Sequence, residues 1–134
     1  MSNPINEWKR KSKHPLRKCG LGKNLSDVAL IDTDLSDCDL SFGILVGCIA
    51  GGVDLSGADL TEADLSRAQL GNANFSGANL TGANLQGAFL GGAIFDDANL
   101  ALADLSGAGI EPRGLDRAYL YLTTMPDGSE ETRT

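Results

Sequence analysis

The sequence predicts an all-β protein in which the chain winds into a coil of about five turns. A large apolar residue recurs at every fifth position from Leu25 to Leu120, and Ala50 is the one small exception. A small residue lies two positions before most of them, with Arg113 as an exception near the end of the period, and turn-forming residues fill most of the rest. Neither an α-helix nor a long strand has this period, because five residues rotate a helix by about 140° and bring a strand to its opposite face.

Each five-residue unit is expected to form a very short strand and a corner. Residues two apart share one face of a strand, so Ala58 and Leu60 should point inward while Asp59 points outward. Pairs such as Ser56-Gly57 are typical of tight turns. If every corner turns the chain by about 90°, four units close a turn of 20 residues, and successive turns stack about 4.8 Å apart.

The repeated units also resemble a known family. Residues 58–62, 63–67, 73–77 and 78–82 read ADLTE, ADLSR, ANFSG and ANLTG, which is similar to the A(D/N)Lxx motif of the pentapeptide repeat family. The resemblance covers about 70% of the chain and implies a right-handed quadrilateral β-helix. The ending TTMPDG at residues 123–128 resembles that of many cyanobacterial members.

The chain divides into three expected segments. Residues 1–20 form a basic N-terminal arm or cap, and residues 1–18 carry six Lys or Arg against one Glu. Residues 21–111 form the β-helix, which we expect to end near Ile110. Residues 112–134 form a C-terminal cap and tail, partly helical, in which residues 112–126 fold over the end of the coil.

The cysteines and the targeting signals indicate a cytoplasmic protein. Cys19, Cys38 and Cys48 are an odd number, and the last two take the small inward position, so we expect buried free thiols in a reducing compartment. The basic start lacks the apolar stretch of a secretory signal. Residues 42–53 are apolar, but about 12 residues are too few to span a bilayer, so no transmembrane segment is expected.

No catalytic, cofactor or metal site is predicted. The single histidine, His14, lies outside the coil among basic residues, so a nucleophile–histidine pair has no positioned imidazole. No Cys or His cluster has the spacing of metal ligands. The acidic residues recur along an exterior without forming a pocket, and we therefore expect a protein without enzymatic activity.

Sorting the outward residues by the 20-residue turn separates one charge-poor side from the others. This side surrounds Leu30, Ala50, Leu70, Leu90 and Ile110 and is rich in glycine, with Asp32 and Glu111 as its charges. It is the predicted face for binding a protein partner or for forming a homodimer. The residues expected to make that contact are Ile31, Ile49, Gln69 and Phe89.

An acidic ridge on the neighbouring corner gives an alternative function. Some members of the family that the sequence resembles inhibit DNA gyrase by imitating duplex DNA, which requires an acidic rod. Three features argue against this alternative. The stack is short, the basic arm opposes the mimicry, and the ridge is interrupted at Asn74, Asn79 and Asn99. Such a coil is not expected to bind nucleic acid directly. The ridge residues are Asp34, Asp39, Asp54, Asp59, Asp96 and Asp97.

The two ends of the coil are the remaining candidate surfaces, because a β-helix exposes unpaired strand edges there. Trp8 lies in the N-terminal arm, while Tyr119, Tyr121 and Leu122 follow the predicted end of the coil. These four residues are expected to form caps, or at the C-terminal end a contact between two copies of the chain.

Overall fold

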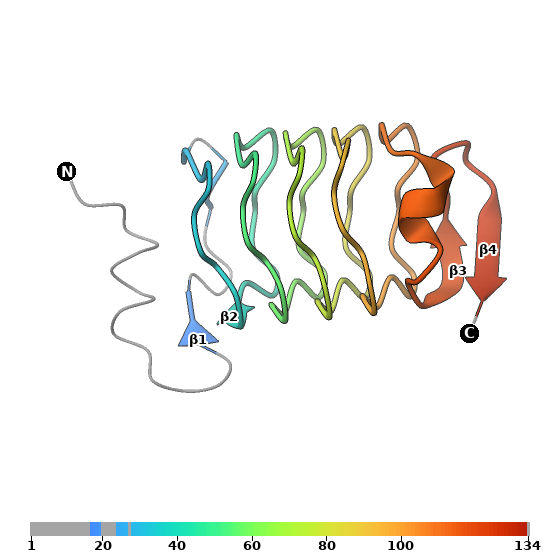
Figure 1. The fold of residues 1–134 in the computed structure, drawn as a ribbon, viewed down its shortest axis with the longest axis horizontal. Coiled ribbons are helices and arrows are strands. Elements are labelled where there is room, and N and C mark those ends of the chain that lie inside the picture. The colour runs from blue at the N-terminus through green and yellow to red at the C-terminus, as the bar shows by residue number, and fades with distance from the viewer. Residues whose placement is uncertain (1–16, 20–23, 27, 134) are drawn as a thin grey trace.

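The computed structural model is a four-sided coil whose turns stack along one axis (Figure 1). It describes residues 17–19, 24–26 and 28–133. Parallel bridges of single residues join each turn to the next at a spacing of 20 residues, as in the series Asp39, Asp59, Asn79, Asn99 and Tyr119. This spacing confirms the predicted all-β quadrilateral β-helix.

The interior consists of the residues that keep the five-residue period. Leu60, Leu80 and their equivalents are fully buried, as are the small residues that precede them by two positions, such as Ala58 and Ala78. Since inward residues 20 apart lie one above another, they form continuous apolar columns. In one column the rings of Phe75 and Phe95 stack in parallel with their centroids 4.8 Å apart.

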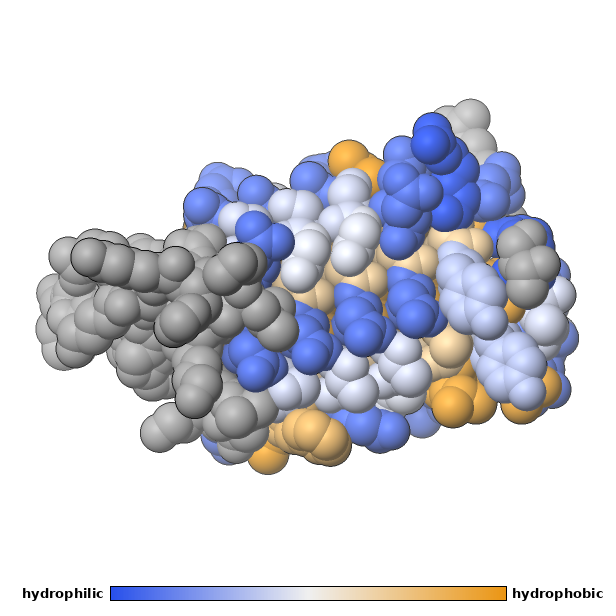
Figure 2. Space-filling view, turned by 90° about the horizontal axis from the view of Figure 1, so that it is seen from below, coloured by the Kyte–Doolittle hydropathy of each residue, from blue (hydrophilic) through white to orange (hydrophobic). Residues whose placement is uncertain are grey.

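Outward Asp and Asn residues fix the corners. The Oδ1 atom of each of eleven such residues accepts the backbone N–H two positions later, at 2.9–3.1 Å. We call this hydrogen bond the Asx cap, because it satisfies an amide that the turn would otherwise leave without an acceptor. Figure 2 shows the result on one face, where hydrophilic residues form a row along the coil.

The N-terminal turn corrects the expectation of free thiols. Strand β1 (Arg17–Lys18) pairs in parallel with β2 (Cys38–Asp39). A disulfide joins Cys19 to Cys38 with the Cα atoms 5.3 Å apart, whereas Cys48 is the free, buried thiol. The five-residue period does not predict this bond, because Cys19 precedes the period and lies beside Cys38 through a changed register.

The C-terminal turn shows that the predicted end of the coil at Ile110 is too early. After Ile110 the chain forms a 3-10 helix, η1 (Pro112–Leu115), and then resumes the 20-residue spacing, with Asn99 bridged to Tyr119 and Asp104 to Thr124. Strand β3 (Leu120–Thr124) thus continues the coil, and β4 (Glu130–Arg133) pairs with it in antiparallel orientation and closes the edge (Figure 1). The other boundary, at residue 20, lies outside the described residues.

Candidate functional site

The structure brings the predicted interaction residues together on one side of the coil, which we call the neutral side. Ile49, Gln69 and Phe89 lie in one row, each bridged to the next. With Ile31 they line a shallow groove whose floor is made by glycines; its lining residues are Ile31, Asp32, Ile49, Gly51, Gly52, Gln69, Gly71, Asn72 and Phe89. Ile31 is 57% exposed, Ile49 48% and Phe89 58%, so three large apolar side chains face solvent here.

The glycine floor lets the Phe89 ring lie flat. A Cβ atom added to Gly91 would be 2.8 Å from the Cζ atom of Phe89, and one added to Gly71 would be 3.0 Å from Cε1. Any other residue at Gly91 would therefore push the ring away. The ring therefore lies along the surface with one apolar face outward, in a position from which it can contact a partner without rearrangement.

The neutral side also lacks every Asx cap. The residues in the capping position are Ala29, Ile49, Gln69, Phe89 and Gly109. In the part of the chain that the structure describes, no acceptor is found for the N–H groups two positions later, which belong to Ile31, Gly51, Gly71, Gly91 and Glu111. We call these five groups the uncapped amides. They follow one another along the neutral side, one for each turn, and those of Ile31, Gly51 and Gly71 line the groove. Each can donate to an external acceptor.

The scarcity of charged residues in the sequence predicted the neutral side, but the uncapped amides were not predicted. The signal was present, because the positions 29, 49, 69, 89 and 109 lack Asp and Asn while most equivalent positions on the other sides have one. The absence of Asp and Asn at these positions indicates uncapped amides only once the Asx cap is known, and the five-residue period alone does not predict that cap.

The acidic ridge is assembled only in part. Asp34 is bridged to Asp54 and Asp39 to Asp59, but Asn74 and Asn79 replace the acids on the following turn. The carboxylates of Asp54 and Asp59 also have a structural role, since each accepts a backbone N–H and a hydroxyl group. Asp96 and Asp97 belong to a later turn, beyond the neutral Asn residues.

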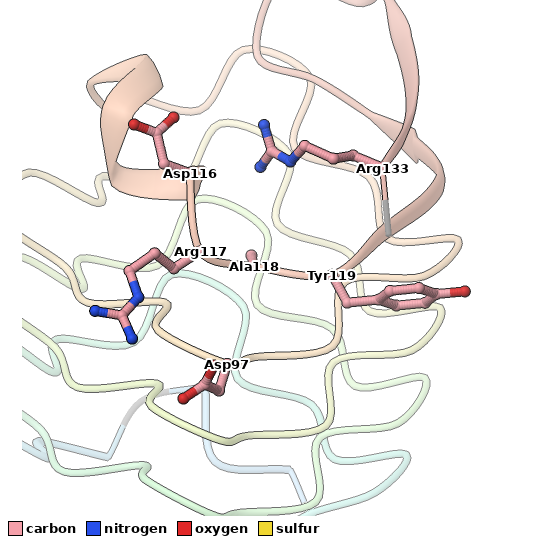
Figure 3. Close-up of a pocket in the computed structure, with 6 residues that line it drawn as sticks. All are labelled: Asp97, Asp116, Arg117, Ala118, Tyr119 and Arg133. Carbon is pink, nitrogen blue, oxygen red and sulfur yellow. The ribbon is translucent and has the colours of Figure 1, made fainter.

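A basic residue approaches the ridge at its C-terminal end. The Arg117 guanidinium lies 3.9 Å from an Asp96 carboxylate oxygen, in a pair exposed to solvent. Figure 3 shows Arg117, Asp97, Asp116 and Arg133 around a shallow pocket beside the last turn, with Tyr119 projecting away from them. Two arginines and two aspartates give this pocket balanced charge, and Arg133 donates to the Leu115 carbonyl oxygen.

The residues predicted for a C-terminal cap or dimer contact lie on the last turn. Tyr119, Tyr121 and Leu122 are each exposed by more than 40%, and Leu102, on the preceding turn, is exposed as well. Leu122 donates its N–H to the Thr132 hydroxyl of β4, so this segment is fastened within the chain. Trp8 and His14 lie outside the described residues.

The described residues offer no cluster of three or more His, Cys, Asp or Glu side chains that could hold a metal ion. Burial raises the pKa of the Cys48 thiol to about 11, so this thiol is protonated and unreactive at neutral pH. Within the same part of the chain, no helix combines the length and apolar character needed to cross a bilayer.

Comparison with known proteins agrees with this geometry. The sequence model of pentapeptide repeats, in eight copies, matches residues 45–77 and 73–108. The solved structure of alr5209, a pentapeptide repeat protein from Nostoc PCC 7120, is 30% identical, covers 87% of this chain and 91% of its own, and has a TM-score of 0.69. No curated protein matches the chain.

Two further structures extend the likeness. HetL, a pentapeptide repeat protein involved in heterocyst differentiation regulation from the cyanobacterium Nostoc sp. PCC 7120, is 35% identical over 82% of this chain, with a TM-score of 0.72. A pentapeptide repeat protein of the Arabidopsis thaliana thylakoid lumen is 37% identical over 66% of the chain, with a TM-score of 0.64. The chain spans 52% of HetL and 61% of the thylakoid protein, so both are longer.

Proposed function

The chain belongs to the pentapeptide repeat family, and from this premise we propose that it is a non-enzymatic scaffold that binds a partner protein along its neutral side. The observation that carries the proposal is the row of uncapped amides beside exposed apolar side chains. One partner could satisfy both features, because its oxygen atoms can accept hydrogen bonds from these amides while its apolar surface covers Ile49 and Phe89.

The energetics favour this side over the others. Burying apolar surface contributes about 25 cal/mol per Å², so Ile31, Ile49 and Phe89 would each contribute on the order of 1 kcal/mol when covered. Few charges must be desolvated there, because Asp32 and Glu111 are the acidic residues of this side. On the opposite side, outward Asp and Asn would lose hydration when a partner covers them.

The test is a double substitution with a matched control. Ile49→Asp with Phe89→Asp places two charges in the groove, while Ile44→Asp with Ile94→Asp places the same charges at exposed isoleucines on other sides. We expect the first variant to lose at least tenfold in affinity for a partner captured from the native host, or to lose self-association in sedimentation. The control should bind like the wild type. All three proteins should have the same circular dichroism spectrum.

Equal binding by the two double variants would rule out the neutral side as the interface. Loss of binding in both would instead show that added negative charge anywhere on the coil prevents binding. In the first case the C-terminal residues Tyr119, Tyr121 and Leu122 become the next surface to substitute.

The acidic ridge supports the alternative, DNA-mimicking inhibition of DNA gyrase, less well. The ridge is interrupted at Asn74 and Asn79, and Arg117 lies beside Asp96 at its end. Mimicry needs continuous negative charge along the rod. A supercoiling assay with purified protein decides the matter, since the alternative fails if gyrase is not inhibited at micromolar concentrations of the protein.

Native mass spectrometry of the purified protein tests the absence of enzymatic activity. We expect the mass of the polypeptide alone. A bound metal ion or organic cofactor in stoichiometric amount would contradict a scaffold without chemistry of its own.

A further inference from the structure

The first turn of the coil differs from the others in its register. Elsewhere, bridged residues are 20 apart, but Arg17 pairs with Cys38 and Lys18 with Asp39, which are 21 apart. As a result Cys19 takes the place that Leu40, Leu60 and Leu80 take on the following turns: its N–H donates to the Asp39 carbonyl oxygen, just as the Leu40 N–H donates to that of Asp59.

Residues 17–19, at the described start of this turn, are held less firmly than residues 24–37, which are bridged to the next turn at Asn24, Ala29 and Asp34. The hydrogen bond from Cys19 to Asp39 is 3.4 Å long, whereas the equivalent bond from Leu40 to Asp59 measures 2.8 Å. At the top of the apolar column, Cys19 buries a smaller side chain than the leucines below it. Strand β1 is only two residues long. Among the described residues, the disulfide to Cys38 is therefore the strongest tie between residues 17–19 and the next turn.

We propose that the Cys19–Cys38 disulfide is a site of thiol–disulfide exchange that controls whether β1 is attached to β2. The reductant is a protein dithiol: one of its thiolates attacks a sulfur of the disulfide and forms a mixed disulfide, and its second thiolate then displaces the cysteine. The dithiol is oxidised to a disulfide, and Cys19 and Cys38 gain two electrons and two protons to become thiols.

Reduction has a local structural consequence. Once the bond is broken, the contacts of residues 17–19 with the described part of the chain are the pairing of two strand residues and one long hydrogen bond, and we expect β1 to separate from β2. The backbone of Cys38–Asp39 then becomes a free strand edge, which can pair with another strand. The remaining turns keep their own hydrogen bonds, because neighbours in a coil contact each other directly.

Both sulfurs are buried, so exchange requires transient opening of the first turn. Among the described residues, β1 pairs with β2 alone, so its opening disturbs one described neighbour. Cys48 does not compete for the exchange, since its thiol is buried and protonated at neutral pH.

Trypsin cleavage after Arg17 and Lys18 reports the attachment of β1. The full chain is oxidised and divided into three samples, which receive buffer, dithiothreitol under native conditions, or a protein dithiol of the thioredoxin class. We expect cleavage after Lys18, followed by mass spectrometry, to accelerate at least tenfold in both reduced samples. The melting midpoint of the coil, followed by circular dichroism, should shift by only a few degrees.

Substitutions separate this role from a purely structural one. Cys19→Ser with Cys38→Ser should be cleaved rapidly with or without reductant, and Cys48→Ser should respond like the wild type. Equal cleavage rates in oxidised and reduced wild type would overturn the proposal. So would three free thiols in the oxidised protein, a disulfide that native exchange cannot reduce, or melting of the whole coil on reduction. The proposal is independent of binding at the neutral side.

Discussion

Replacing Gln69 by Asn should stabilise the protein, because it restores an Asx cap in the middle of the neutral side. The Gly71 N–H is one of the uncapped amides. At the equivalent position of another side, Asn79 Oδ1 accepts the Thr81 N–H at 3.1 Å and the Thr81 hydroxyl at 2.7 Å. An asparagine at position 69 has the same backbone geometry available and should form the first of these bonds.

The expected gain follows from the value of one exposed cap. Capping side chains contribute about 1 kcal/mol at helix ends, and exposed hydrogen bonds lie near 0.5 kcal/mol, so the gain should be about 0.5 to 1 kcal/mol. For a chain of this size that corresponds to a rise of about 2 to 5 °C in the melting temperature. Urea unfolding and thermal melting measure both quantities. If partner oxygens use the Gly71 amide, the same variant should bind its partner more weakly.

Two control variants make the result interpretable. Gln69→Ala removes the glutamine without supplying an oxygen and should leave stability within about 0.5 kcal/mol of the wild type. Asn79→Ala removes an existing cap and should lower the free energy of unfolding by about 1 kcal/mol. If Asn79→Ala destabilises while Gln69→Asn has no effect, the Gly71 amide is already satisfied and the account of the uncapped amides is wrong.

Three further variants test the core, the buried thiol and one corner. Phe95→Ala should lower the free energy of unfolding by about 3 to 5 kcal/mol in urea, because it removes the ring stacked on Phe75; a loss below 1 kcal/mol would mean that the column collapses around the gap. Burial raises the pKa of the Cys48 thiol to about 11, so the free energy of unfolding should be unaffected by this thiol below pH 9 and should fall by roughly 3 kcal/mol between pH 9 and 11. Cys48→Ala should lack this part of the alkaline fall in stability. Leu102 has a φ of 62° and a half-exposed side chain, so Leu102→Gly should raise stability by about 1 kcal/mol, and a lower melting temperature would show that its side chain has a packing role.

The regular part of the fold was predictable because each unit repeats the same physical requirement. A buried Leu, a small residue two positions before it and an outward polar residue between them determine the strand, and the corner residues determine the bend. The 20-residue bridge from Asp39 to Asp59 follows from four equal corners. Since every turn meets the same neighbours, one correctly understood unit predicts the rest.

The ends were less predictable because there the period and the structure diverge. Leu115 and Leu120 keep the five-residue period and are fully buried, yet Pro112 favoured an early end of the coil. At the other end Cys19 occupies a leucine place through a 21-residue spacing, which no period of five can reveal. A change of register depends on local backbone geometry, and sequence periodicity carries no information about it.

Missing Asx caps are most frequent on the neutral side. Among the described corners of the other three sides, the capping position holds a residue other than Asp or Asn at Ile44 and Ile94 and, on the last turn, at Gly114, Tyr119 and Thr124, whereas on the neutral side it does so at all five turns. Each missing cap forgoes about 0.5 to 1 kcal/mol, so the neutral side lacks roughly 2 to 5 kcal/mol that the same fold could obtain. A loss of this size on one side, combined with exposed Ile49 and Phe89, supports the proposal that a partner protein binds there.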